Sequence, residues 1–347
     1  MIPMTSSLES RKNRFGMTLI ELMVVIAILG LLAVTVLPVF NGSPNKALLR
    51  NAAATVESHV AQGFSKAIGS RTGYGLWIAQ SNTSATLSIQ NYCTTLAFCS
   101  GMSVAQVTAT LTVPTSGTSQ SIGVSLIPTV STLFPGSQVP SGTLISFLGL
   151  PYEYELQSPS GTSVCMRTSQ NQTPFNASWP QVSGTIQLQC GISIPPARIF
   201  GRKTLLVGNS CVDLSCSTVG VYAYSPSIDQ IGPTSPLIIT FDPTGQVKSA
   251  MYSILGSSST MPQQRRIDTR TPIALLVGMR DQVGQAFIST PTDDTPGTNY
   301  QRKDAFWVVI DPRTGTAMII ENYPNATDIS TAQTFIRQTL LNRNSAQ

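Results

Sequence analysis

Residues 17–40 have the sequence MTLIELMVVIAILGLLAVTVLPVF, an almost wholly apolar run that contains one carboxylate, Glu21. As a helix this run would extend about 36 Å, which is enough to cross the hydrocarbon core of a bilayer. Residues 1–16 before it are polar and basic. Because positive charge is retained on the cytoplasmic side, we expect a cytoplasmic N-terminus and an exported remainder, with a single span in the inner membrane.

Glu21 separates the classes of protein that could begin in this way. An ionised carboxylate inside a span costs roughly 2.5–3.5 kcal/mol at mid-membrane, so a simple anchor leaves it unexplained. A secretory signal peptide would need small residues after the apolar run, where residues 37–40 are Leu, Pro, Val and Phe. A lipoprotein would need a cysteine there. Glu21 therefore predicts a function for the segment beyond anchoring.

Residues 14–21, RFGMTLIE, resemble the processing site of type IV prepilins and pseudopilins. In that family a membrane peptidase cuts after the glycine and methylates the new N-terminus. The resemblance implies cleavage between Gly16 and Met17, N-methylation of Met17, and a helix bend at Pro38. It also implies, as partners, the prepilin peptidase, other pilin or pseudopilin subunits, an inner-membrane assembly platform, and membrane lipid before assembly.

The chemistry of Glu21 suggests how such subunits would assemble. The new α-amino group of Met17 would lie one helical turn from Glu21, and nearer still to the Glu21 of an axially displaced neighbour. Each charge is costly alone in an apolar setting, and pairing them offsets part of that cost. We therefore hypothesise that Glu21 sets the axial register between subunits.

A second helix is expected after residues 41–43, because Ser43 and Pro44 are typical of an N-cap and a first helical residue. It should end near Gly69. His59, the single histidine, is expected to be a partly packed helix residue rather than a catalytic group or metal ligand. The helix should pack through an apolar stripe formed by Leu49, Ala52, Ala53, Val56, Val60, Phe64 and Ala67.

Beyond residue 70, short apolar runs alternate with proline- and glycine-bearing turn signals. We expect an α+β protein: a long N-terminal helix, then a β-rich, mainly antiparallel head over residues 70–347, with a subdivision near 150 or 225. A short C-terminal helix is expected at 330–342. The expected strands are 74–79, 85–89, 106–113, 121–127, 143–148, 152–157, 163–167, 185–189, 202–207, 219–224, 237–241, 274–279 and 306–310.

Two segments, 241–247 and 310–317, share a strand that ends in Asp-Pro, a glycine-bearing turn and a following strand. Asp-Pro begins such a turn and glycine permits a positive φ, so both predict hairpins. The first also resembles the F-x-P-x-G hairpin of GspH/FimT-type minor pseudopilins, although this chain is about twice as long as members of that group. The resemblance therefore implies an enlarged head.

Six cysteines follow the apolar run, an even number that suits disulfides in an oxidising compartment. Disulfides between cysteines close in the sequence would form short loops, but the connectivity stays open. The alternative is that the cysteines are buried free thiols. The six residues are Cys93, Cys99, Cys165, Cys190, Cys211 and Cys216.

The sequence offers little support for catalysis or for a cofactor. The sole histidine lies in the second helix, and motifs for zinc, redox or nucleotide chemistry do not occur. Asp293 and Asp294 could bind calcium, but a solvated loop explains them as well. A solvated charge run is the simpler explanation of the basic cluster near residue 265. A DNA-binding role would use the cations and aromatic rings of Arg265, Arg266, Arg270, Tyr252 and Tyr300.

Together these patterns predict a structural subunit, a minor pseudopilin of a type II secretion or type IV pilus-like filament, that is not an enzyme. The alternative is a DNA- or surface-binding tip adhesin on the same scaffold, although no nucleic acid is expected. The sequence does not distinguish the secretion, pilus and competence systems.

Overall fold

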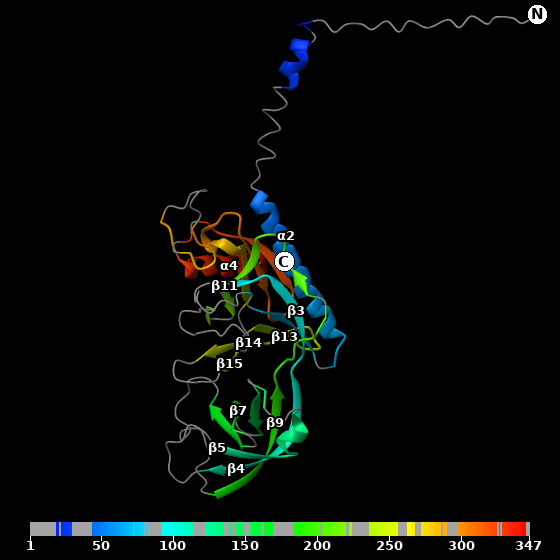
Figure 1. Ribbon diagram of the computed structural model, residues 1–347, viewed down its shortest axis with the longest axis vertical. Helices are drawn as coiled ribbons and strands as arrows, with labels where there is room; N and C mark the ends of the chain where they lie inside the picture. Colours follow the sequence, from blue (N-terminus) through cyan, green and yellow to red (C-terminus); the bar gives the residue numbers. More distant parts are fainter. Residues whose placement is uncertain are drawn as a thin grey trace, which may run out of the picture. The chain divides into compact units, whose positions relative to one another are not determined.

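The chain has 347 residues, and it forms two compact units, residues 1–47 and 48–347, which are described separately. The structure is a computed structural model (Figure 1). It describes residues 19–20, 22–29, 44–71, 73–79, 81, 92–113, 122–134, 139–140, 143–148, 153–160, 163–168, 184–201, 203–219, 222–223, 236–255, 262–267, 272–285, 287–289, 297–324, 326 and 328–344.

Helix α2 (Pro44–Ile68) begins at the proline expected to open it and ends one residue before Gly69. Its apolar stripe is buried as expected, with the ring of Phe64 partly exposed at one end. Arg50, Ser58 and Gln62 lie outside the stripe and are exposed. The 3.6-residue period of the apolar side chains therefore determines which face of α2 packs on the strands.

Two antiparallel sheets pack against α2. Sheet A has the strand order β10-β3-β1-β13-β14-β15, and sheet B has the order β12-β11-β16-β17-β18, with β2 also paired to β11. The strands of sheet A are β1 (Tyr74–Ile78), β3 (Thr95–Ser100), β10 (Thr204–Leu205), β13 (Leu237–Phe241), β14 (Val247–Leu255) and β15 (Pro262–Ile267). Those of sheet B are β2 (Tyr92–Cys93), β11 (Ser210–Val219), β12 (Tyr222–Ala223), β16 (Ile273–Met279), β17 (Phe306–Ile310) and β18 (Ala317–Glu321).

Sheet B is covered on both faces. Phe306, Val308 and Ile310 of β17 point into the core shared with α2 and sheet A. The alternate residues Trp307 and Val309 pack instead against helix α4 (Ile329–Asn344). This double burial explains why β16 and β17 are continuous apolar runs rather than alternating ones.

The remaining strands close into a barrel with the order β4-β5-β8-β7-β6-β9. Strand β9 closes it by pairing with β4 along eleven residues of each strand, from Ser103↔Ile194 to Val113↔Gly184. The helical turn α3 (Val130–Leu133) follows β5. The other strands are β4 (Ser103–Val113), β5 (Ile122–Ile127), β6 (Leu144–Phe147), β7 (Glu153–Ser160), β8 (Ser163–Thr168) and β9 (Gly184–Ile194).

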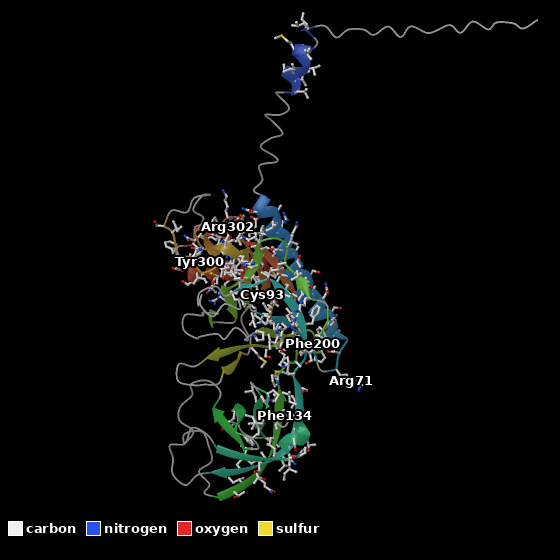
Figure 2. All side chains as sticks on the ribbon, viewed as in Figure 1. Arg71, Cys93, Phe134, Phe200, Tyr300 and Arg302 are labelled. Atoms are coloured by element: carbon white, nitrogen blue, oxygen red, sulfur yellow. The ribbon has the colours of Figure 1, made fainter. Side chains whose placement is uncertain are left out.

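The barrel is inserted into sheet A. It follows β3 and precedes β10, and these two strands pair with each other in the sheet. Its core is built separately, from alternate residues such as Val107, Ala109 and Leu111, with Phe134 beside α3 (Figure 2). The positions near 150 and 225, where a subdivision was expected, lie outside the described residues; in the sequence, 150 comes between β6 and β7, both of which belong to the barrel.

The fold class is therefore α+β with mainly antiparallel strands, as expected. Most expected strands and the C-terminal helix are confirmed, whereas the one expected at 85–89 lies outside the described residues. Strands β2, β3, β15 and most of β11 were not predicted. Within the described part of the chain, the structure contains no helix with the length and apolar character needed to cross a membrane.

Candidate functional site

The described residues of the first unit form an exposed apolar helical stretch. Residues 19–20 and 22–29 are helical, and their large apolar side chains have exposed fractions from 40% at Val25 to 75% at Leu19. A helix that is apolar on all sides is stable only when lipid or other helices cover it. This stretch therefore requires an apolar environment that the described residues of its own unit do not supply.

In the second unit, the two Asp-Pro turns that the sequence identified as similar both lie against the ring of Phe64 on α2. Residues 242–246 link β13 to β14, and residues 311–316 link β17 to β18. The carboxylate of Asp242 accepts hydrogen bonds from Thr244 and Gln246, and that of Asp311 accepts them from the turn residues that follow it. Both predicted hairpins are confirmed.

These two turns also contact each other. The amide of Val247 donates a 2.9 Å hydrogen bond to the carbonyl oxygen of Pro312, which joins sheet A to sheet B. Gly245 and Gly315 have φ angles of +91° and +68°. A Cβ on either glycine would collide with the ring of Phe64, and one on Gly315 would also collide with the carbonyl oxygen of Gly245. Glycine is therefore required at both positions.

His59 lies where α2 meets β3 and β10, and only 2% of it is exposed. Its Nε2 is 3.1 Å from the carbonyl oxygen of Ala97, which can only accept, so Nε2 carries the proton. Nδ1 then accepts from the hydroxyl of Thr204 at 3.3 Å. The ring stacks on Phe98 with centroids 4.0 Å apart. The histidine is thus more deeply packed than the sequence indicated.

Burial lowers the pKa of His59, and the nearby ammonium of Lys66 lowers it further, against the hydrogen bond to Ala97. Lys66 lies over the rings of Phe98 and Tyr74, with Nζ 4.2 and 5.2 Å from the centroids. The imidazole is therefore neutral near neutral pH, and it contributes packing and hydrogen bonds between α2 and sheet A.

Comparison with known proteins bears on the N-terminal segment. Residues 11–37 match the family model described as the prokaryotic N-terminal methylation motif. The chain carries that motif. The match is consistent with the type IV prepilin and pseudopilin family, and it covers the expected cleavage position and Glu21. No curated protein and no solved structure matches the chain.

Several expected residues of the methylation segment lie outside the described part of the structure. They are Gly16, Met17, Glu21 and Pro38. The exposed apolar stretch at 19–29 lies within the matched segment and immediately follows the expected cleavage position. The contact between the Met17 amine and Glu21 therefore stays a prediction.

Another polar centre, not anticipated from the sequence, lies at the bulge of β11. Asp213 is fully buried, and it accepts hydrogen bonds from Ser215 and, at 2.8 Å, from the side-chain amide of Asn299. Burial raises the pKa of Asp213, and these donors oppose the shift. The hydroxyl of Ser217 donates to the carbonyl oxygen of Asp213 and accepts from the amide of Leu276, which bridges the interrupted ladder.

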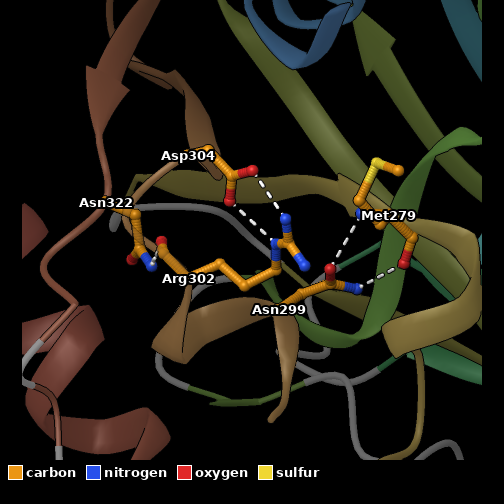
Figure 3. A network of polar contacts seen from close by, with 5 residues as sticks. All are labelled: Met279, Asn299, Arg302, Asp304 and Asn322. Atoms are coloured by element: carbon orange, nitrogen blue, oxygen red, sulfur yellow. Dashed lines mark hydrogen bonds and ion pairs between the residues drawn. The ribbon is translucent and has the colours of Figure 1, made fainter. Parts of the chain in front are cut away.

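Asn299 and its neighbours hold the loop before β17 onto sheet B (Figure 3). The Asn299 amide pairs with both backbone groups of Met279, at 2.8 and 3.0 Å, as a further strand would. Asn299 is the first residue of the short 3-10 helix η3 (Asn299–Gln301). A second 3-10 helix, η2 (Arg280–Gln282), directly follows β16. Arg302 forms a two-pronged ion pair with Asp304, and Asn322 accepts from the Trp307 indole at 2.7 Å. These contacts are structural, since each group already has its partner.

The expected disulfides are wrong for the five cysteines whose side chains are described, because all five are free thiols. Cys93 and Cys99 lie in different sheets. Cys211 and Cys216 are five positions apart in β11, on the order of 15 Å, whereas a disulfide needs Cα atoms within about 7 Å. Cys190 is in the barrel core on β9, which does not neighbour β8, the strand of Cys165.

Burial also makes these thiols poor nucleophiles. It raises the pKa of Cys93 and of Cys99 to about 12 and that of Cys190 to about 11. It also raises the pKa values of Cys211 and Cys216, and the carboxylate of Asp213 adds to both shifts. A protonated thiol neither attacks nor binds metal readily. The open alternative of buried free cysteines is therefore the one that the structure supports.

The weaker sequence candidates are only partly brought together among the described residues. The predicted calcium residues Asp293 and Asp294 lie outside the described residues, and the described ones contain no cluster of three metal-ligating side chains. Arg265 on β15 pairs directly with Tyr252 on β14, at an edge of sheet A, and Arg266 pairs with Met251. Tyr300 is instead on η3 and packs against the α4 cluster (Figure 2). Arg270 lies outside the described residues. Tyr300 therefore does not lie with the arginines of β15, whereas Tyr252 does.

Proposed function

We propose that this chain is a pilin-like subunit that is made as a precursor, cut between Gly16 and Met17, and assembled into a filament through its N-terminal helix. One observation carries the proposal: the methylation motif at residues 11–37 coincides with an apolar helical stretch that is exposed on all sides. Processing would release the basic leader, residues 1–16, and leave an apolar helix for lipid first and for neighbouring subunits afterwards.

The proposed assembly uses charge to set the register. The freed amine of Met17 and the carboxylate of Glu21 would pair between axially displaced subunits, since either charge alone is costly in an apolar bundle. Residues 17–40 would form the membrane and assembly helix, 41–69 the amphipathic stalk, and 70–347 the exported head. The subunit would thus act by assembly and not by catalysis.

Within this class we place the chain as a minor pseudopilin with an enlarged head, of a type II secretion or type IV pilus-like system. Its partners would be the prepilin peptidase, other subunits and the inner-membrane assembly platform. The hairpin at 241–247 is what supports the likeness to the GspH/FimT group. The barrel inserted in sheet A favours a second candidate, a surface-binding tip subunit, because its separate core could present a contact surface without disturbing the sheets.

Mass spectrometry of the N-terminus tests the processing step directly. Expressed with a prepilin peptidase, the chain should begin at Met17 and carry one added methyl group, and without the peptidase it should keep the leader. An intact leader in both strains, or a cut beyond residue 40, would exclude the class. In a deletion strain, loss of secretion supports the pseudopilin assignment, whereas loss of surface attachment alone supports the tip subunit.

A Glu21→Ala variant tests the register hypothesis separately from processing. We expect it to be cut and methylated as usual but to enter filaments poorly, because the amine of the neighbouring subunit then lacks its partner. Wild-type incorporation of this variant would show that Glu21 does not set the register.

A further inference from the structure

Exposed apolar side chains are concentrated at one edge of sheet A, in a stretch that we call the edge segment, residues 199–201 and 203–207. It contains Phe200, Leu205 and Val207, with exposed fractions of 95%, 68% and 57%, together with Ile199. Figure 2 shows Phe200 at the margin of the head near α2. Solitary exposed apolar residues are ordinary, but four within nine positions of the chain mark a contact surface.

The backbone of the edge segment is also available for pairing. Strand β10 is the last strand of sheet A, paired to β3 on one side, and the other side has no partner among the described strands. The Leu206 amide donates inward to Thr94 at 2.9 Å. Because backbone groups alternate in an antiparallel ladder, those of Leu205 point toward the free edge. Such an edge is a template for an added strand.

The side chains of the edge segment alternate in the same way. Leu206 is buried in the core under α2, and the hydroxyl of Thr204 contacts His59. Leu205 and Val207 therefore point to the opposite face of the sheet. On the α2 side of Thr204 lies an open cavity of about 300 Å³, lined by Ala54, Thr55, Ser58, His59, Gln62 and Thr204. An added strand would therefore lie beside the apolar side chains of Leu205 and Val207 on one face of the sheet, and beside the cavity next to Thr204 on the other.

The charge within the chain segment that forms this edge has one sign, although Glu57 on α2 and Asp281 on η2 are acids of neighbouring elements. No aspartate or glutamate occurs between Glu155 and Asp213, whereas Arg198, Arg202 and Lys203 lie within six positions of one another in the sequence. Lys203 is exposed, and so is Lys66 on the neighbouring helix. The other edge of sheet A is β15, which carries Arg265 and Arg266, so edge-to-edge pairing of two copies would bring like charges together. Charge thus favours an acidic partner over a second copy.

We propose that the edge segment binds an extended segment of another protein, with alternating apolar and acidic residues, as an added strand on β10. Backbone hydrogen bonds to Leu205 would supply affinity, and Lys203 would select carboxylates. The inference goes beyond the proposed function and does not depend on N-terminal processing. Its ligand is the added strand, whichever protein supplies it.

The test uses the purified full-length chain and short blocked peptides, with binding measured by fluorescence anisotropy. We expect a peptide of alternating valine and glutamate to bind, and its valine–lysine counterpart to bind at least about tenfold more weakly. Leu205→Pro should abolish binding, because it removes an outward-facing amide and leaves the inward ladder intact. Lys203→Glu should reverse the preference. Leu148→Glu, at a barrel residue that is 87% exposed, is the matched control and should change nothing.

Three results would overturn the proposal. The first is glutamate-peptide binding that survives Leu205→Pro, or that falls equally in Leu148→Glu. The second is self-association of the chain, measured by sedimentation, that Leu205→Glu removes, since the occupant would then be a second copy. The third is binding to phosphatidylglycerol vesicles that Leu205→Glu and Lys203→Glu remove, without binding to either peptide, which would identify a lipid surface at the edge segment instead.

Discussion

The contact between the two Asp-Pro turns can be tested with a single methyl group, by Gly315→Ala. At φ +68° an alanine is strained by about 1–2 kcal/mol. The new Cβ also collides with the carbonyl oxygen of Gly245 and with the ring of Phe64. Relieving that collision separates the turns and costs the Val247–Pro312 hydrogen bond, about 1 kcal/mol. We expect Gly315→Ala to lower the free energy of unfolding by about 2–4 kcal/mol.

The assay is urea denaturation of the full-length chain, followed by near-ultraviolet circular dichroism and tryptophan fluorescence. Gly201→Ala is the matched control, because its added Cβ meets nothing within 4 Å and its φ is not positive. That variant should be neutral or more stable by up to about 1 kcal/mol, since alanine restricts the unfolded chain. If Gly315→Ala were within about 0.5 kcal/mol of Gly201→Ala, the turns would not be in contact as described.

Three further predictions concern buried polar groups. Because the folded-state pKa of His59 is lowered below 6.5, the unfolded chain binds the proton more readily. The free energy of unfolding should therefore fall as pH drops through 6.5 toward the folded-state pKa. In His59→Phe, denaturation measured across this pH range should lack that decrease. The five described thiols should resist iodoacetamide in the folded protein and react once it is unfolded, as mass spectrometry can count; rapid labelling of folded Cys93 would contradict their burial. Asn299→Ala should cost about 2–4 kcal/mol in urea denaturation, because it removes a donor from buried Asp213 and leaves the Met279 amide unpaired; a loss below about 0.5 kcal/mol would show that water replaces the side chain.

Local pattern was sufficient for the elements whose residues carry their own signal. The stripe of α2 follows from helical periodicity, and the apolar runs of β13, β16 and β17 are dense enough to mark buried strands. The turns at 242–245 and 311–315 follow from the φ that proline fixes and the positive φ that glycine permits. The methylation segment was found from residues 14–21, where a glycine, a following apolar run and one glutamate coincide.

Elements stabilised by distant partners were missed. Strand β11 has an aspartate and several serines where a strand normally has apolar residues, and Asp213 is tolerated there because Asn299, 86 positions away, donates to it. The disulfide prediction was wrong because the number and order of the cysteines do not show which sheet each of them occupies. The absence of acidic residues from 156 to 212 was the sequence signal for the basic edge segment. Only the structure shows that this segment pairs with β3 on one side and leaves its other side as the edge of the sheet.

The sequence alone thus determined the methylation motif, the packed face of α2 and the two hairpins, because each depends on residues within a few positions of one another. The tertiary structure decided that the two similar turns touch, that a barrel is inserted between β3 and β10, and that His59 is buried where α2 meets sheet A. Strand pairing joins residues far apart in the chain, and its choice depends on the burial of whole faces, which no local period encodes.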